Sequence, residues 1–268
     1  MRGRAILLVL TACLTAAGGV CAMGNHGPRL QCDYDSDYDV QVQPNGVAFT
    51  RDSGHPADVF MHDGQLRVDG RAVTVSAQDV ARLREYEQQM RELVPAMAAI
   101  ARGGVDVGYA ALATVAVTMA DNGDQRTHLL QTLRDRRAEA LQQMDDTLGR
   151  GLWKAGDQSE LFNQNLQKTV SDLVGGITGD AVSDALSGDP DRLAALQARA
   201  NALDATLDKA VETPAEKLGQ RAETLCPRLN ALHQLQQQFQ FRLADGGRLR
   251  LLSSDMDSSN QARQYAQR

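Results

Sequence analysis

VTVSAQDVARLREYEQQMRELVPAM, residues 73–97, contains the point at which the chain changes from strand to helix. Before Ser76, apolar and polar residues alternate, which is typical of a half-buried strand. After it, Leu83 and Met90 recur at a spacing of seven, which places them on one helical face. Ser76 is a helix N-cap, with Asp79 at the third helical position as in an acidic capping box. The stretch therefore predicts an α+β fold, with a sheet upstream and helices downstream.

Upstream of this point we predict a small antiparallel β region over residues 23–75. Apolar residues alternate with polar ones from residue 38 to residue 42, and Pro44-Asn45-Gly46 supplies a hairpin turn. Two further turn signals, Asp63-Gly64 and Asp69-Gly70, separate shorter strands.

Downstream we predict a predominantly helical domain over residues 76–239. Gly103-Gly104 is expected to end its first helix, because glycine is a poor helix former. A second helix is expected over residues 105–120, where the chain is apolar on nearly every side, and a third over residues 124–148.

Two later segments, residues 190–210 and 214–239, carry apolar faces with the heptad-like spacing of a coiled coil. The first opens with Asp189-Pro190, an N-cap followed by a proline in the first turn. We predict that the two segments fold back on each other as a long helical hairpin in the helical bundle. Pro227 is expected to interrupt the second segment, because proline lacks an amide hydrogen.

The end of the chain is expected to return to β structure, as a C-terminal β-hairpin over residues 240–252. Apolar residues alternate on both sides of the turn Asp245-Gly246-Gly247, with Phe241 before it and Leu249 after it. Because an isolated hairpin is barely stable in water, we expect it to join the sheet begun at the N-terminus. The polar tail, residues 253–268, is predicted to be disordered.

Residues 1–22 have the pattern of a signal peptide. Two arginines precede the apolar run at residues 5–10, and Val20-Cys21-Ala22 forms a small-x-small cleavage site. Cleavage after Ala22 would release the mature chain outside the cytoplasm.

A second processing route is open, because Leu10-Thr11-Ala12-Cys13 resembles a lipobox and predicts a lipoprotein anchored at Cys13. The apolar run before that cysteine is shorter than the usual signal core of about 7 to 15 residues. Cutting after Ala22 instead removes the first two cysteines and leaves Cys32 and Cys226, an even pair that an oxidising compartment can join. The sequence therefore favours the cleaved, soluble form with a disulfide bond between these two residues.

The charge of the chain excludes one class of partner. It has 28 basic and 34 acidic residues and a net charge of −6, without a basic stripe. Binding to phosphate backbones depends on clustered lysine and arginine. We therefore expect no nucleic-acid partner.

The layout of the chain resembles a known family. The signal peptide is followed by Cys32, by Tyr-Asp-Val-Gln-Val-Gln-Pro at residues 38–44 with its hairpin, by a long helical middle and by the late Cys226. In this order the chain is similar to the YggN-like family of bacterial periplasmic proteins of unknown function. The resemblance implies a location in the envelope of a Gram-negative cell, and it brings no catalytic residues.

Acidic residues alternate from Asp33 to Asp39 and would share one face of a strand, where they could attract a cation. An EF-hand loop needs glycine at its sixth position and glutamate at its twelfth, and neither register supplies them. We interpret the cluster as a solvated strand edge that discourages aggregation, with cation binding left open.

The histidines lack the spacing of metal ligands, which favours ordinary surface positions. The alternative is a weak metal site formed by His55 and His62 across a turn, with Asp58 or Asp63. The sequence also lacks a nucleophile elbow, a P-loop and a dinucleotide fingerprint. We therefore predict no catalytic residue, no cofactor, no metal ligand and no enzymatic activity.

The leading hypothesis for function is a non-enzymatic interaction or maintenance role in the cell envelope, with an envelope protein as partner and the helical faces as contact surface. The alternative is binding of a membrane surface or an apolar ligand through residues 104–120, where Gly104 and Gly108 would allow a close helix contact. This segment contains Asp106 and is shorter than the ~20 residues of a membrane span, so membrane association is not favoured. A hydrolase with an unrecognised site is a third, weaker hypothesis.

Overall fold

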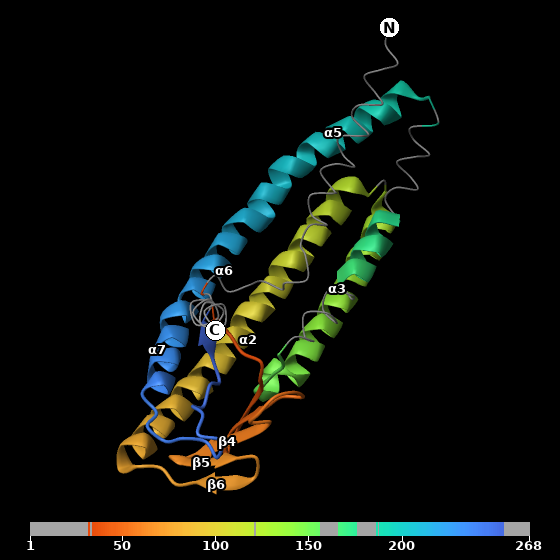
Figure 1. The fold of residues 1–268 in the computed structure, drawn as a ribbon. Helices are drawn as coiled ribbons and strands as arrows, with labels where there is room; N and C mark the ends of the chain where they lie inside the picture. Colours follow the sequence, from red (N-terminus) through yellow and green to blue (C-terminus); the bar gives the residue numbers. More distant parts are fainter. Residues whose placement is uncertain are drawn as a thin grey trace, which may run out of the picture.

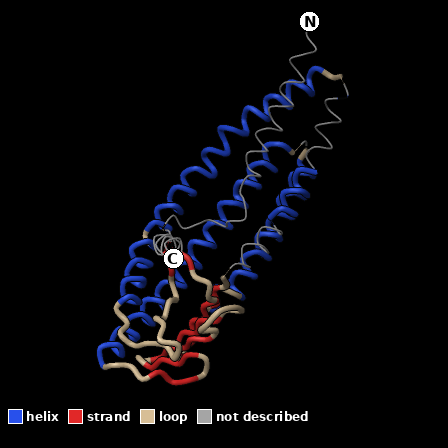
Figure 2. The backbone as a smooth tube through the Cα atoms, in the orientation of Figure 1, coloured by secondary structure: helices blue, strands red, loops and turns tan. Residues whose placement is uncertain are grey.

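The computed structural model describes residues 32, 34–120, 122–155, 166–175, 186 and 188–254. The molecule is elongated, with a small antiparallel sheet at one end and long helices that run away from it (Figure 1, Figure 2). It is an α+β protein and mostly helical, which confirms the predicted fold class. The predicted signal peptide, with Ala22 and Cys13, lies outside the described residues.

A six-stranded antiparallel sheet in the order β6-β5-β4-β3-β2-β7 forms the base of the molecule. Its strands are β2 (Asp39–Gln43), β3 (Gly46–Thr50), β4 (Asp58–His62), β5 (Gln65–Val68), β6 (Arg71–Val73) and β7 (Leu152–Trp153). The hairpin predicted around Pro44 is confirmed, because Gln43 pairs with Gly46. Strands β4 and β7 have no counterpart among the predicted strands.

The two predicted turns between the later strands are confirmed, and both hold residues in the left-handed region. Asp63 and Gly64 have φ of 47° and 80°, and Asp69 and Gly70 have φ of 48° and 75°. A Cβ on Gly64 would lie 2.8 Å from the backbone oxygen of Val80, in the first turns of the following helix. Glycine at this position allows the turn and the helix to approach each other closely.

Helix α2 (Ala77–Met119) begins where the sequence predicts. The Ser76 Oγ accepts a hydrogen bond from the Asp79 backbone N–H at 3.1 Å. The buried Asp79 carboxylate also accepts from Arg82 at 3.0 Å and from the backbone N–H of Gln240 at 3.1 Å. The start of α2 is therefore joined to the C-terminal part of the chain.

The break predicted at Gly103-Gly104 is wrong, because α2 continues through both glycines to Met119. Two glycines in a helix cost about 1 kcal/mol each, which the packing of neighbouring helices on both sides of α2 can outweigh. A Cβ on Gly103 would lie 2.6 Å from a terminal methyl of Leu218. Gly103 thus makes room for a neighbouring helix rather than ending its own.

Helix α3 (Gly123–Asp146) confirms the third predicted helix and runs back along α2 (Figure 1). Its N-cap is Asn122, whose side-chain oxygen accepts from the Gln125 N–H at 2.8 Å. Arg137 pairs with Asp106 of α2 at 2.6 Å. The long helical hairpin of this fold is therefore the pair α2 and α3, followed by the short helix η1 (Leu148–Arg150).

The helical hairpin predicted between residues 190–210 and 214–239 is wrong. Helices α5 (Pro190–Leu207), η2 (Asp208–Glu212), α6 (Thr213–Glu223) and α7 (Leu225–Gln237) follow one another along the other side of α2 (Figure 1). Pro214 stands at the start of α6, where a missing amide hydrogen costs little, and the π-helical turn η2 precedes it.

The interruption predicted near Pro227 is found three residues earlier, at Thr224. This residue separates α6 from α7 and has ψ of −14°. Pro227 itself lies in the first turn of α7, where a proline is tolerated. The sequence therefore predicts an interruption of this segment correctly but places it three residues too late.

The C-terminal β-hairpin predicted over residues 240–252 is wrong, because no strand occurs there. The turn exists, since the Leu243 N–H donates to the Gly247 oxygen at 3.0 Å. The backbone N–H groups of Leu251 and Leu252 donate to the side-chain oxygen of Gln236, at 2.6 and 3.0 Å. The buried Gln236 amide thus takes the place of a partner strand.

The C-terminal segment does pair with the N-terminus, in a strand that begins directly after the predicted hairpin. Strands β1 (Tyr34–Asp35) and β8 (Ser253–Ser254) form a separate two-stranded sheet. The part of the predicted tail that the structure describes, Ser253 and Ser254, is therefore ordered in a strand, while residues 255–268 lie outside the description.

The described part of the molecule has two hydrophobic cores. The larger core joins the sheet, the first half of α2, α7 and the segment after α7; its most buried side chains include Tyr38, Val47, Phe49, Val59, Met61, Leu83, Tyr86 and Leu232. The smaller core lies between the second half of α2, α3 and the helical residues 166–175; it consists of Val105, Tyr109, Ala116, Leu133, Ala140 and Leu173. The helical end is therefore the more thinly packed part.

Candidate functional site

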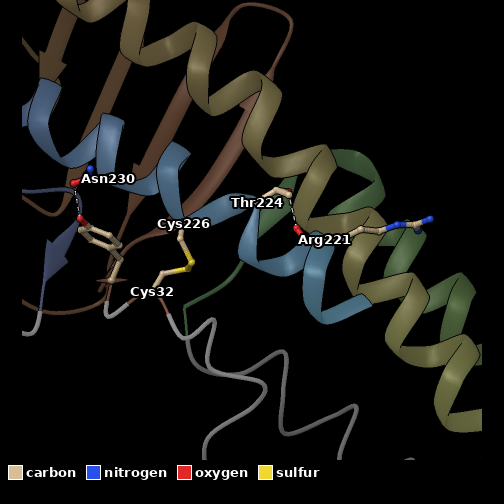
Figure 3. The surroundings of a disulfide bond; sticks show 6 residues. Cys32, Arg221, Thr224, Cys226 and Asn230 are labelled. Carbon is tan, nitrogen blue, oxygen red and sulfur yellow. Dashed lines mark hydrogen bonds between the residues drawn. A yellow bond between two sulfur atoms is a disulfide. The ribbon is translucent and has the colours of Figure 1, made fainter. Parts of the chain in front are cut away.

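The predicted bond between Cys32 and Cys226 is present, with the two Cα atoms 5.1 Å apart (Figure 3). It joins the segment before β1 to the start of α7. Beside it, the Tyr34 hydroxyl donates to the side-chain oxygen of Asn230 at 2.9 Å. The disulfide and this hydrogen bond hold the N-terminal segment against α7.

A shallow surface groove of about 510 Å3, which we name the charged groove, lies between the sheet and α2. The residues that line it are Pro44, His62, Asp63, Arg84, Glu87, Gln88 and Arg91. The turn between β4 and β5 supplies the histidine and the aspartate, and successive turns of α2 supply the other charged side chains. The groove therefore forms only when the sheet is docked on the helix.

Glu87 is the central residue of this groove and is largely buried. Its carboxylate accepts from the Asp63 backbone N–H at 2.8 Å and from Arg91 at 2.7 Å, and the ring of His62 lies 3.5 Å away. Arg91 also donates to the backbone oxygen of Gln43 at 2.6 Å. Glu87 and Arg91 thus fasten two β-turns to α2.

Burial of Glu87 acts to raise the pKa of its carboxyl group. The hydrogen bonds from Arg91, from the Asp63 backbone and from His62 act in the opposite direction, and the net pKa lies below its ordinary value of 4.5. The folded protein therefore binds the proton on Glu87 less readily than the unfolded chain does. The contribution of Glu87 to stability is complete above pH 4.5 and is lost as the pH falls through the lower pKa of the folded state.

We expect Glu87→Gln to lower the free energy of unfolding at pH 7 by about 2 kcal/mol, because a buried, charge-assisted network loses its charge. The same variant should lose less stability than the wild type when the pH is lowered from 6 to 3. Urea denaturation at several pH values measures both effects. The control is Glu85→Gln on the exposed face of α2; equal pH profiles for the two variants would contradict the assignment.

The charged side chains that line this groove form ion pairs with one another. Arg84 pairs with Asp63 at 2.7 Å, and Arg91 pairs with Glu87. A second groove of about 340 Å3, near η1, contains Arg102, which pairs with Asp145. Neither groove places a nucleophile beside a general base. Both grooves are therefore better explained as surface gaps where secondary-structure elements pack together than as catalytic sites.

The aspartates between Asp33 and Asp39 do not converge in the part of the chain that is described. Asp33 itself is outside it. Asp35 accepts from the Ser36 N–H at 2.8 Å, Asp37 lies 4.0 Å from Arg51, and Asp39 accepts from the Ala155 N–H at 2.7 Å. They act as separate local acceptors.

The alternative metal site at His55 and His62 is not assembled. Among the described residues, no group of three or more histidine, cysteine, aspartate or glutamate side chains is placed to hold a metal ion. Instead, His62 faces Glu87, and Asp63 pairs with Arg84. Both residues belong to the charged groove.

The second half of α2 is apolar and mostly half-buried, and its Val117 is 43% exposed. By length and composition, α2 contains an 18-residue stretch apolar enough to cross a membrane, and only 17% of that stretch is buried. A core helix of a soluble protein can have the same length and apolar composition, but such a helix is mostly buried. The large apolar side chains that are exposed all belong to the helical part of the chain: Val117, Val170, Val174, Leu186 and Leu193.

Three structural residues have no counterpart in the sequence predictions: Glu87, Arg91 and Gln236. The first two lie four residues apart on a helix, a spacing that indicates an ion pair. For Gln236 we find no signal in the sequence, because its partners are backbone groups fifteen or sixteen residues further on.

These features define a class of protein: an α+β protein with its N-terminal segment tied to a late helix by a disulfide, and with no assembled catalytic or metal centre in its described residues. The chain belongs to the family described as "Protein of unknown function (DUF2884)", which matches residues 32–252. The matched region begins at the first disulfide cysteine and ends just before β8.

The names of the curated relatives state no function. The chain is 26% identical over 174 residues to "Uncharacterized protein YggN" of Escherichia coli strain K12, which covers 64% of this chain and 70% of the relative. The proteins of the same name from strains O6:H1 and O157:H7 give the same values. The resemblance to the YggN-like family is thereby confirmed. No solved structure matches this chain.

Proposed function

We propose that this protein is exported to the periplasm and acts there as a non-enzymatic interaction protein of the cell envelope. The disulfide between Cys32 and Cys226 supports the compartment, because such bonds persist in oxidising spaces. The predicted signal peptide, residues 1–22, would deliver the chain there.

One observation carries the proposed role: in the part of the chain that the structure describes, only 17% of the 18-residue apolar stretch of α2 is buried. Helix α2 lies between α3 and α5 (Figure 1). Most side chains of its second half are only partly buried, and Val117 is exposed. Exposed apolar patches of this kind mark contact sites for other molecules. The contact surface is therefore the second half of α2 with its exposed neighbours in residues 166–175, which we name the distal apolar face: Val117, Val170 and Val174.

The partner that fits this face is an envelope protein with an apolar helix or groove of its own. Asp106 of α2 pairs with Arg137 of α3 at 2.6 Å, which places charged groups on the same half of α2 as Val117. An apolar centre with a polar rim is the usual composition of a protein interface.

A membrane surface or an apolar ligand is the second candidate, because the length and composition of α2 favour it. In this case the distal apolar face would lie against acyl chains. The half-exposed Asp106 opposes deep insertion, because a charged group is costly in hydrocarbon.

Site-specific photo-crosslinking in intact cells tests the first proposal. A photoreactive phenylalanine analogue at Val117 should form one major adduct with an envelope protein, and the same analogue at the exposed Gln65 of β5 should not. Flotation of the mature protein with phospholipid vesicles tests the second candidate. Failure of both experiments, or recovery of the protein from the cytosol with free thiols, would refute the proposed function.

A further inference from the structure

The helices α5, η2 and α6 form one continuous helical arm, residues 190–223, along α2 (Figure 1). None of the side chains described in this arm is fully buried. The next helix, α7, differs sharply, because it buries leucines at positions 225, 229, 232 and 235 in the larger core. The arm is therefore bound to the molecule more weakly than the helix that follows it.

The junction between the arm and α7 is suited to a hinge. Thr224 interrupts the regular helix, with its hydroxyl bonded to the Arg221 oxygen at 2.6 Å (Figure 3). Pro227 has no amide hydrogen to donate to the carbonyl of Glu223, so one hydrogen bond that would cross the junction is missing. On the far side, Cys226 is fixed by its disulfide. Rotation at Thr224 would therefore move the arm and leave α7 in place.

The arm covers part of the apolar surface of α2. Half-buried leucines recur in it at helical spacing, at positions 196, 203, 207 and 218, and form the side that faces α2. Leu218 packs on the two glycines of α2, with a terminal methyl where a Cβ of Gly103 would lie. The boundary between the two hydrophobic cores lies at the same position along α2 as these glycines, between Ile100 and Val105.

We infer that the arm is a lid, hinged at Thr224, that opens as a unit to uncover the apolar side of α2. This inference rests on the proposed function, because the uncovered surface extends the distal apolar face. Opening costs only the half-buried contacts of the arm, and the core around α7 and the disulfide stays intact. A partner that binds the uncovered surface competes with the arm.

Hydrogen exchange of the oxidised full-length protein, followed by mass spectrometry, tests the lid without any partner. We expect the backbone amides of the arm to exchange as one group, at least about tenfold faster than those of α7. Equal protection of the arm and α7 would overturn the inference.

Two glycine variants of α2 provide a matched pair for the same measurement. Gly103→Ala places a methyl group against Leu218, whereas a Cβ on Gly108 meets no atom within 4 Å. Both changes raise the helix propensity of α2 equally. Gly103→Ala should speed exchange in the arm about threefold relative to Gly108→Ala, with α7 unchanged. Identical exchange in the two variants would also overturn the lid.

These measurements are independent of the proposed function. If the arm opens but Val117 forms no adduct and no vesicle binds, the lid stands and the proposed role fails. If the adduct forms at Val117 while the arm and α7 exchange alike, the role stands and the lid fails.

Discussion

A variant in which Cys32 and Cys226 are both replaced by serine is expected to lose about 4 kcal/mol of folding free energy. The bond closes a loop between residues 194 positions apart, so it removes much conformational freedom from the unfolded chain. The native state should change little, because the leucines of α7 remain packed in the larger core. The loss is therefore expected to arise mainly in the unfolded state.

Urea denaturation followed by circular dichroism measures this loss, with oxidised wild type as reference. Reduction of the wild type provides the control, because it should lower the midpoint as far as the double substitution does. The hydrogen bond between Tyr34 and Asn230 and the pairing of β1 with β8 should weaken first, since the disulfide holds both in place. Coinciding midpoints for the oxidised wild type and the variant would show that the bond does not stabilise the fold.

Local signals in the sequence predict the local structure well. Ser76 caps α2, and Asp63-Gly64 and Asp69-Gly70 form turns, because these conformations depend on side chains a few residues away. The cysteine pair is also predictable, since the predicted cleavage after Ala22 would leave only Cys32 and Cys226 to join. Each of these features is set by chemistry that a short window of sequence contains.

The errors arise where distant contacts decide. Gly103-Gly104 would break an isolated helix, but α2 gains from neighbours on both sides, and the sequence around the glycines does not contain them. In the C-terminal segment, the alternation correctly predicts that Phe241 and Leu249 are buried. It does not predict which group accepts the backbone hydrogen bonds, and Gln236 takes that place instead of a strand.

The charged groove also depends on contacts between distant residues that the sequence does not predict. The spacing of Glu87 and Arg91 indicates an ion pair on α2, and the turn at Asp63 is visible in the sequence. Their contact depends on how the sheet docks against the helix, because the Asp63 backbone donates to Glu87 across twenty-four positions. The components of the groove can be predicted separately, and their assembly cannot.

Asp79 is the other residue whose loss should have a large effect. Its side chain is only 1% exposed and accepts hydrogen bonds from three groups: the Ser76 hydroxyl at 3.2 Å, Arg82 at 3.0 Å and the Gln240 backbone N–H at 3.1 Å. It thus combines the charge favoured at a helix N-terminus with a tie to the C-terminal segment.

Replacement of Asp79 by alanine is expected to lower the free energy of unfolding by about 3 kcal/mol, because it leaves the Gln240 amide and the Arg82 guanidinium without their buried acceptor. Asp124→Ala is the matched control. It removes an acidic residue from the first turn of α3, but this residue is exposed, so the loss should stay below about 1 kcal/mol. Urea denaturation of both variants measures the difference. Equal losses would mean that Asp79 acts only through the charge at the helix end, and that its bond to Gln240 contributes nothing to holding the C-terminal segment on the core.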